Sequence, residues 1–341
     1  MSNTPTNSRV VLASRPAPEA TLSNFRLEDT PVPALQDGQV LVRNHWLSLD
    51  PYMRGRMSDA KNYVAPQALG QTMGGGTVGV VQASHSPSFA VGDTVVCMGG
   101  WQQWTLLDAR QPGVLRRVDV SRIPMAAYLG AVGMPGVTAW YGLTQIIAPK
   151  AGETVVVDAA SGAVGSAVGQ LAKARGCRVV GLAGGAEKCA YAVDGLGFDA
   201  CIDYKAHAGV DSLAAALDIA APGGVDGLFE NVGGPIFDVV MSRMNAFGRI
   251  ALCGLISGYD GAPIPMAAPR LLLTQRLKLQ GFIVSEHMGF WPEALKELAG
   301  RVEGGSLKYR ETIAPNLAAA PEAFLGLLKG KNFGKQLVKL V

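Results

Sequence analysis

The ten residues ASGAVGSAVG at positions 160–169 stand between a strand-like run, residues 154–157, and a helix-like segment, residues 166–175. Gly162 and Gly165 lack the Cβ atoms that would keep a phosphate group away from such a turn. The first turn of the helix presents unpaired N–H groups and the positive end of its dipole to the same place. The stretch therefore predicts a strand–turn–helix that binds a dinucleotide.

Two observations bear on how specific this prediction is. The usual G-x-G-x-x-G pattern has Ala160 in its first position here, and a glycine-rich turn without any ligand is the alternative. The strand-like run at residues 177–182 favours the dinucleotide, because it supplies the second strand of a βαβ unit. Gly169, one helical turn further on, is expected to let the helix pack closely on the sheet.

The residues after the second strand indicate which dinucleotide binds. NAD-selective proteins usually carry an acidic residue about 20 residues beyond the glycines, bonded to the adenosine ribose. This chain instead reads AGGAEK at positions 183–188. The small residues leave room for a 2′-phosphate that Lys188 can pair with, so we expect NADPH (NADP+) rather than NADH. Glu187 opposes this expectation unless it points outward from a helix start, and a solvated surface lysine is the alternative for Lys188.

Composition predicts a two-domain enzyme that acts on small molecules. Of the 341 residues, 48% are hydrophobic and 43 are glycine, as expected for α/β domains with many tight turns. The 30 Lys and Arg against 27 Asp and Glu leave a formal charge of +3, too small to indicate a nucleic-acid or membrane surface. The N-terminal residues are polar, and no apolar run reaches the roughly 18 residues of a membrane span. The five cysteines form no C-x-x-C pair. We expect a cytoplasmic protein with reduced thiols.

The pattern of strands and helices predicts two kinds of domain. In the middle of the chain, apolar strands alternate with helices at the spacing of βαβ units, which predicts a parallel sheet covered on both faces. Its six expected strands are residues 154–157, 178–182, 200–203, 227–230, 249–253 and 279–284. The first part of the chain is typical of an antiparallel β-barrel, with short alternating runs at residues 39–43, 76–81 and 93–97. After the middle segment come a helix near residues 318–329 and a final strand, 335–341, which is expected to return to the first domain.

Six motifs follow one another along the chain. They are LSLDPYMRG at 47–55, GMPGVTA at 133–139, AASGAVG at 159–165, ENVGG at 230–234, CGLISGY at 253–259 and KGKNFGK at 329–335. Together they resemble the zinc-independent branch of the medium-chain dehydrogenase/reductase superfamily. That branch contains leukotriene B4 12-hydroxydehydrogenase/prostaglandin reductase, plant 2-alkenal reductases and bacterial NADPH-dependent curcumin reductase. GGAEKC at 184–189 and the run at 324–335 resemble the curcumin-reductase group most, and the resemblance covers nearly the whole chain.

This resemblance implies a domain arrangement and an enzyme without a metal. A GroES-like catalytic domain is expected at residues 1–130 and 305–341, and a Rossmann NADPH-binding domain at residues 131–304. Zinc-dependent relatives carry a cysteine ligand near Asp50, and a Gly-His-Glu sequence where this chain reads QTMG at 71–74. The four histidines of the chain match no ligand spacing, so we expect no metal site.

The expected reaction is reduction of a C=C bond conjugated to a carbonyl group. Without zinc as a Lewis acid, alcohol oxidation loses its usual means of stabilising an alkoxide. Reduction of a conjugated C=C bond needs only hydride delivery and hydrogen bonds to a developing enolate. The resemblance implies the same chemistry, with hydride passing from NADPH to the β-carbon of an enone or enal. An NADPH-dependent quinone reductase and a non-enzymatic NADPH-binding or sensor protein are the alternatives. The expected partners are a small-molecule substrate and a second copy in a homodimer, without nucleic acid or membrane.

Two tyrosines are expected to have catalytic roles. Tyr259 follows a strand end and a glycine-rich loop, at the sheet edge where doubly wound folds bind ligands. The resemblance places it beside the nicotinamide ribose and the substrate, so we rank it first as carbonyl donor or proton relay. Tyr52 resembles a family tyrosine of the substrate cleft, and a structural tyrosine is the alternative for each. Tyr63 and Met134 are further expected substrate contacts.

The resemblance also implies a set of cofactor-binding residues. Gly162, Ala163, Val164 and Gly165 are expected on the pyrophosphate, and Lys188 and Tyr204 at the adenosine phosphate. The remaining positions are Asn231, Cys253, Gly254, Leu255, Ile256, Ser257, Tyr259, Phe282, Ile283, Val284 and Asn332. For Asn332, which lies between two glycines, a turn-forming asparagine is the alternative.

Overall fold

The computed structural model describes residues 6–261 and 263–341, and the chain divides into two compact units. One unit is the continuous segment Ala131–Arg310. The other ends its first part at Gly130 and resumes at Glu311–Val341, whereas the sequence places the return at residue 305. Over the described ranges, no helix combines the length and the apolar character needed to cross a lipid bilayer.

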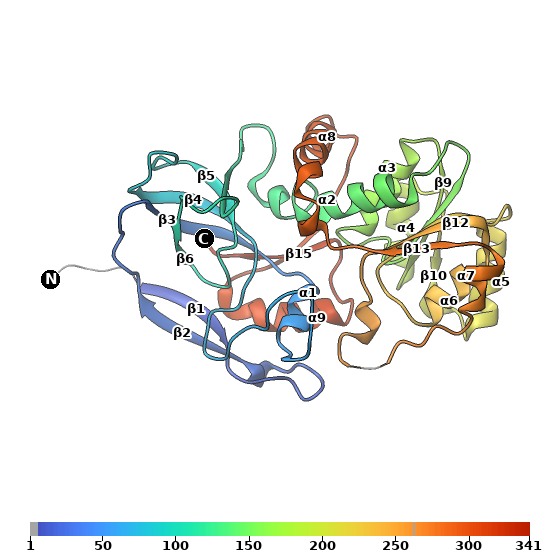
Figure 1. The fold of residues 1–341 in the computed structure, drawn as a ribbon, viewed down its shortest axis with the longest axis horizontal. Helices are drawn as coiled ribbons and strands as arrows, with labels where there is room; N and C mark the ends of the chain where they lie inside the picture. The colour runs from blue at the N-terminus through green and yellow to red at the C-terminus, as the bar shows by residue number, and fades with distance from the viewer. Residues whose placement is uncertain (1–5, 262) are drawn as a thin grey trace. The chain divides into compact units, whose positions relative to one another are not determined.

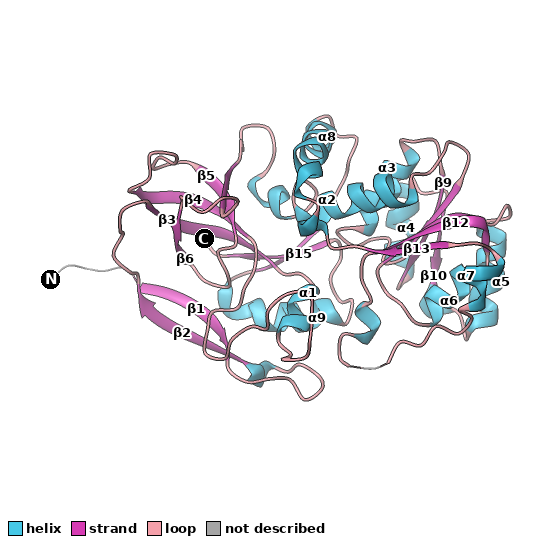
Figure 2. Cartoon of the chain, in the orientation of Figure 1, coloured by secondary structure: helices cyan, strands magenta, loops and turns pink. Residues whose placement is uncertain are grey.

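The continuous unit is built on a six-stranded parallel sheet of order β10-β9-β8-β11-β12-β13 (Figures 1 and 2). Its strands are β8 (Thr154–Val157), β9 (Arg178–Ala183), β10 (Ala200–Asp203), β11 (Val225–Glu230), β12 (Met244–Leu252) and β13 (Lys278–Gly281). Successive strands run outward from β8 to β10 and then, on the other side, from β11 to β13. The direction reverses between β8 and β11, and ligands of such sheets bind beyond the carboxyl ends of the strands at that reversal.

Alternate strand residues face two separate hydrophobic cores. Val155 and Val157 pack with one group of helices, whereas Val156 between them packs with the other. The first core is shared with α2 (Met134–Tyr141), α3 (Gly165–Lys173), α4 (Ala186–Ala190) and α8 (Trp291–Glu303). The second is shared with α5 (Val210–Ala220), α6 (Pro235–Met241) and α7 (Arg270–Thr274) (Figure 1). The structure thereby confirms the expected sheet with both faces covered.

The other unit is rich in β-structure. A seven-stranded sheet is accompanied by the antiparallel pair of β1 (Thr6–Leu12) and β2 (Phe25–Pro31). The sheet consists of β3 (Gln39–Ser48), β4 (Thr77–Ser84), β5 (Thr94–Cys97), β6 (Trp104–Asp108), β7 (Leu115–Arg117), β14 (Glu311–Ala314) and β15 (Lys335–Lys339). Strand β15 pairs with β3, so the C-terminal strand returns to the first part of the chain as expected. Two α-helices, α1 (Tyr52–Arg56) and α9 (Ala320–Leu328), complete this unit, and Phe324 of α9 packs edge-on against Trp101.

Gly169 of α3 lies against the aromatic ring of Phe198, which leaves no room for a side chain at position 169. A Cβ atom on Gly169 would lie 1.9 Å from Cζ of Phe198, and one on Gly181 of β9 would lie 3.1 Å from Cδ2 of the same ring. The sequence predicts that Gly169 lets its helix approach the sheet. The structure shows that the space is filled by the buried Phe198 ring, inserted between the helix and the strand.

We expect Gly169→Ala to lower the free energy of unfolding by about 2 kcal/mol, because the new methyl group must displace the Phe198 ring from a packed core. The measurement is urea unfolding. Gly300→Ala in α8 is the matched control, since a Cβ atom there meets nothing within 4 Å. In a Gly169→Ala/Phe198→Leu variant the two costs should be less than additive. Fully additive costs would show that the ring does not limit this site.

Candidate active site

The glycine turn connects β8 to α3 through a tightly bonded backbone. Ala159 adopts a φ of 44°, a left-handed conformation that non-glycine residues rarely take. Its carbonyl oxygen accepts a hydrogen bond of 2.8 Å from the Gly162 N–H, and a Cβ atom on Gly165 would lie 2.4 Å from that oxygen. Gly165 is therefore required by the turn itself, before any ligand is considered.

Ala160 fits the turn because of the neighbouring strand. Its side chain is fully buried, and its N–H donates to the Leu182 carbonyl oxygen of β9 at 3.0 Å. A Cβ atom on Gly181 would lie 2.8 Å from the Ala160 Cβ. The methyl group thus occupies space that a glycine in β9 leaves open, which explains why the motif keeps its shape without its first glycine.

Two lysines and a tyrosine meet beyond the carboxyl ends of β9 and β10. Burial, and then the Lys205 ammonium, lower the pKa of Lys188 on α4, so the two cations lie close enough to repel. A Cβ atom on Gly184 would lie 2.8 Å from both the Tyr204 hydroxyl oxygen and the Lys205 Cε. The glycine therefore allows both side chains to cross the end of β9. Lys205 was absent from the sequence prediction, because adjacency to Tyr204 in the sequence does not reveal where its ammonium lies.

Asp203 orders the backbone around these side chains. Its carboxylate accepts from the N–H of Gly185 at 2.8 Å and from the N–H of Lys205 at 3.0 Å. Glu187 is exposed and its carboxylate lies 3.6 Å from Arg310, which favours the outward position that the NADPH prediction requires. Small residues at the end of β9, two ammonium groups and a phenol fit the 2′-phosphate of NADPH.

A second group of predicted residues lies beyond β11 and β12. The N–H groups of Ile256 and Ser257 donate to the carbonyl oxygens of Asn231 and Val232, at 3.2 and 3.0 Å. These bonds pack residues 253–259 onto the loop that follows β11. Tyr259 caps a short 3-10 helix, Ile256–Gly258, and its hydroxyl oxygen lies 3.4 Å from the position of a Gly254 Cβ. The structure thus brings Asn231, Gly254 and the Tyr259 hydroxyl together at the carboxyl edge of the sheet.

Other predicted positions of this unit contribute less through their side chains. Burial, with Asp158 and Glu230, raises the pKa of the Cys253 thiol to about 12, which keeps it protonated at neutral pH. Phe282 and Val284 have left the sheet, where the sequence predicts strand, because Phe282 turns into the core against Phe229 and Tyr141. Within residues 282–284, the Ile283 side chain and the backbone are therefore the groups that could contact a nicotinamide.

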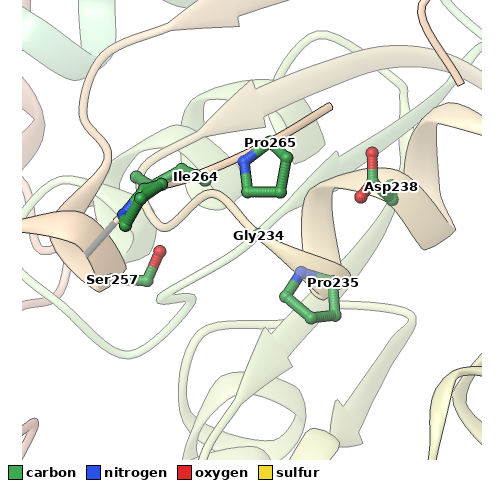
Figure 3. A pocket seen from close by; sticks show the side chains of 7 residues that line it. Gly234, Pro235, Asp238, Ser257, Ile264 and Pro265 are labelled. Atoms are coloured by element: carbon green, nitrogen blue, oxygen red, sulfur yellow. The ribbon is translucent and has the colours of Figure 1, made fainter. Parts of the chain in front are cut away.

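A hollow opens beside the same loops (Figure 3). Its volume is about 330 Å³, and it is lined by Gly234, Pro235, Asp238, Ser257, Pro263, Ile264 and Pro265. The Ser257 hydroxyl donates to the Val232 carbonyl oxygen at 2.6 Å, and Asp238 accepts from the Ala267 N–H at 3.0 Å. Because both polar side chains are engaged within the protein, the hollow mainly offers proline and isoleucine carbons.

The remaining predicted residues are distributed between the units. Tyr52 begins α1, and its pKa is raised by burial, then by the Asp50 carboxylate and Tyr63. Its hydroxyl therefore stays protonated, as a donor must. Tyr63 is 56% exposed in the same unit, whereas Met134 begins α2 and packs on the core of the other unit.

Asn332 takes part in its own turn. Its Nδ2 donates to the Gly334 carbonyl oxygen at 2.7 Å, and the flanking Gly330 and Gly334 have φ values of 65° and 75°. This geometry supports the turn-forming alternative from the sequence. A contact with a cofactor stays a prediction.

Two family models match the chain. The first, an N-terminal domain of oxidoreductase, matches residues 8–114, and the second, described as a zinc-binding dehydrogenase, matches residues 163–300. The NADPH-dependent curcumin reductase of Escherichia coli strain K12 is 45% identical, over 98% of this chain and 97% of the relative. The chain belongs to the medium-chain dehydrogenase/reductase family.

Other proteins also resemble the chain over nearly its whole length. Prostaglandin reductase 1 of Rattus norvegicus is 42% identical and covers 94% of each chain. The crystal structure of CurA from Vibrio vulnificus in complex with NADPH has a TM-score of 0.91 and 45% identity, over 98% of this chain and 99% of that structure. The fold expected from the six motifs is thereby confirmed.

The family description names zinc, but the residues at the expected ligand position do not fit a metal. The cysteine ligand of zinc-dependent relatives is expected near Asp50, and here the buried Lys335 ammonium lies 2.9 Å from the Asp50 Oδ1. Lys335 also donates to the Leu49 carbonyl oxygen at 2.6 Å. A lysine cation thus already balances this carboxylate. Across residues 6–261 and 263–341, no three His, Cys, Asp or Glu side chains form a possible metal site.

Proposed function

We propose that this protein is an NADPH-dependent reductase of the C=C bond of α,β-unsaturated ketones and aldehydes, by hydride transfer to the β-carbon. The observation that carries this proposal is the meeting of three features at one sheet edge. They are the glycine turn, the Lys188–Lys205–Tyr204 cluster and the Tyr259 hydroxyl over Gly254. The names of the relatives support it, since they are an NADPH-dependent curcumin reductase and a prostaglandin reductase.

Different groups of residues would bind different parts of the cofactor. The turn at 162–165 and the N-terminus of α3 face the pyrophosphate, while Lys188, Lys205 and Tyr204 face the 2′-phosphate. Asn231, residues 253–257 and 282–284, and Asn332 are proposed for the nicotinamide end. When bound, NADPH supplies the hydride.

The protein must then stabilise the charge that develops on the substrate. As hydride reaches the β-carbon, the C=C electron pair moves toward the carbonyl, and negative charge gathers on the carbonyl oxygen. A hydrogen bond from the Tyr259 hydroxyl would stabilise this oxygen, and a proton from the tyrosine or from solvent would then be added at the α-carbon. Tyr52, whose hydroxyl stays protonated, is proposed as a second donor or positioning group, with Tyr63 and Met134 as substrate contacts.

A steady-state comparison of four substrates tests this function. NADPH oxidation is followed with curcumin, a short 2-alkenal, a 15-oxo-prostaglandin and a simple quinone. We expect kcat/KM for the conjugated carbonyl compounds to exceed that for the quinone at least about tenfold, and the product to be saturated at the former C=C bond. Faster turnover of the quinone would identify a quinone reductase. No NADPH oxidation with any of the four would favour a binding or sensor protein. The homodimer and the cytoplasmic location stay predictions.

A further inference from the structure

Two fully buried carboxyl groups lie beside each other beneath the proposed cofactor site. Asp158 follows β8 directly before the glycine turn, and Glu230 is the last residue of β11. Both side chains have no exposed surface. Strands β8 and β11 are neighbours in the sheet, at the point where the strand order reverses. The sequence prediction includes Asn231 but neither of these acids.

The pair holds the loop that follows β11 through several hydrogen bonds. Asp158 Oδ1 accepts from the N–H of Asn231 at 2.8 Å and from its Nδ2 at 3.0 Å, and Oδ2 accepts from the Val232 N–H at 3.1 Å. Glu230 Oε1 accepts from the N–H of Val232 at 2.8 Å and from that of Gly233 at 2.5 Å. Three consecutive backbone N–H groups are therefore bonded to two carboxyl groups.

The surroundings of the pair disfavour two negative charges. The Val232 N–H donates to one oxygen of each acid, so the two carboxyl groups lie beside each other. Burial, and then the charge of Glu230, raise the pKa of Asp158 well above its usual value. In the described part of the chain no lysine or arginine contributes to this shift. The Cys253 thiol and the Tyr204 phenol also interact with Asp158. Burial, and then acidic neighbours that include Asp158, raise the pKa of each group, so neither adds a negative charge at neutral pH.

One oxygen of the pair indicates that a proton lies between the two carboxyl groups. Among the described residues, Glu230 Oε2 is buried and has no hydrogen-bond partner. An unsatisfied buried carboxylate oxygen is costly, whereas one proton between the two groups turns one of them into a donor. The orphan oxygen and the contact between the acids therefore have a common explanation.

We propose that Asp158 and Glu230 share one proton and act together as positioning residues, which hold the loop at 231–233 in place for the nicotinamide dinucleotide. The part that concerns the cofactor rests on the proposed function. With the proton, the pair carries one negative charge and bonds all three N–H groups. Without it, two adjacent buried anions repel each other, weaken the loop and oppose the negative pyrophosphate. Tight binding is therefore present while the proton is held, and is lost as the pH rises through the pKa of the pair.

Infrared spectroscopy of the cofactor-free protein tests the shared proton. We expect wild type at neutral pH to show a protonated-carboxyl stretch that shifts in D₂O and is missing from both Asp158→Asn and Glu230→Gln. The exposed Asp211→Asn is the matched control and should keep the band. Absence of the band in wild type, or its presence in both variants of the pair, would overturn the proposal.

Binding of NADH measures the positioning role, because NADH lacks the phosphate that Lys188 and Lys205 would face. We expect the wild-type Kd for NADH, from nucleotide fluorescence, to rise about tenfold as the pH is raised from neutral into the alkaline range. In Asp158→Asn an amide oxygen still accepts from Asn231 while the amide N–H₂ donates to Glu230, so its Kd should stay constant with pH. Glu230→Gln gives a second variant if Asp158→Asn does not fold.

The outcomes separate this inference from the proposed function. Equal pH dependence in wild type and in the folded variants would overturn the positioning role. A folded wild type that has the infrared band but binds neither NADH nor NADPH would also overturn that role, and the proposed cofactor with it. Binding with the expected pH dependence, but without enone reduction, would leave the inference standing and contradict only the proposed substrate.

Discussion

Replacing Lys188 and Lys205 together with alanine is expected to raise the KM for NADPH by about 100-fold and to leave the KM for NADH within a factor of about two. Each ammonium group is expected to contribute a charge-assisted hydrogen bond to the 2′-phosphate, and NADH has no group there. Each single variant should have a smaller effect. The measurement is steady-state kinetics with both nucleotides at saturating substrate.

The size of this effect follows from the geometry of the cluster. Burial, and then repulsion from the Lys205 ammonium, lower the pKa of Lys188, so a dianionic phosphate beside both lysines would relieve an existing cost. Lys296→Ala on α8 is the control, because that lysine is exposed and lies on a different helix from Lys188. A similar loss with NADH and NADPH would remove both lysines from the phosphate site. An effect of Lys188→Ala alone, with none from Lys205→Ala, would leave only the lysine predicted from the sequence.

The second large effect is expected at Tyr259. Replacing it with phenylalanine removes one hydroxyl and should lower kcat for enone reduction by about 100-fold, the usual scale for losing a donor to a developing oxyanion. The Kd for NADPH should change little, because the substitution keeps the ring and the backbone N–H of residue 259, which donates to the Ile256 carbonyl oxygen and closes the turn at 256–258. A larger primary isotope effect with deuterated NADPH is expected, since the hydride step becomes more limiting.

Tyr52→Phe and Tyr309→Phe complete this experiment. Tyr52→Phe should lower kcat/KM less than Tyr259→Phe if Tyr52 positions the substrate. Tyr309 is half-buried and packs against the core of the unit that contains Tyr259, and Tyr309→Phe should have no effect on kcat. Wild-type kcat/KM in both Tyr259→Phe and Tyr52→Phe would show that neither hydroxyl stabilises the enolate. Solvent and the hydroxyl groups of the cofactor would then have to supply the proton.

Much of the fold and of the site follows from local patterns in the sequence. Strands β8 and β10 have the predicted bounds, and the final strand returns to β3, because runs of apolar residues and turn residues act over a few positions. The strand expected at 279–284 ends at Gly281 instead, since burial of the Phe282 ring against distant aromatic side chains outweighs its local strand preference.

The residues of the site also divide into those that local motifs predict and those whose role depends on partners far away in the sequence. Its glycine turn and Lys188 were predicted because a motif and its spacing are local properties. Lys205, Phe198 and the Asp158–Glu230 pair were missed, because each acquires its role only beside a partner from another strand or helix. Asp158 and Glu230 are separated by 72 positions in the sequence, and nothing in either segment indicates that the two carboxyl groups meet.

By itself, the sequence determined the family, the parallel sheet and the presence of a dinucleotide turn, since these depend on residue types at fixed short spacings. Only the tertiary structure decided that Ala160 is accommodated by Gly181, that a second lysine joins Lys188, and that a buried acid pair holds the loop after β11. The physical reason is that packing space, repulsion between charges and the cost of burying a carboxylate depend on distances in space, which the order of residues along the chain does not contain.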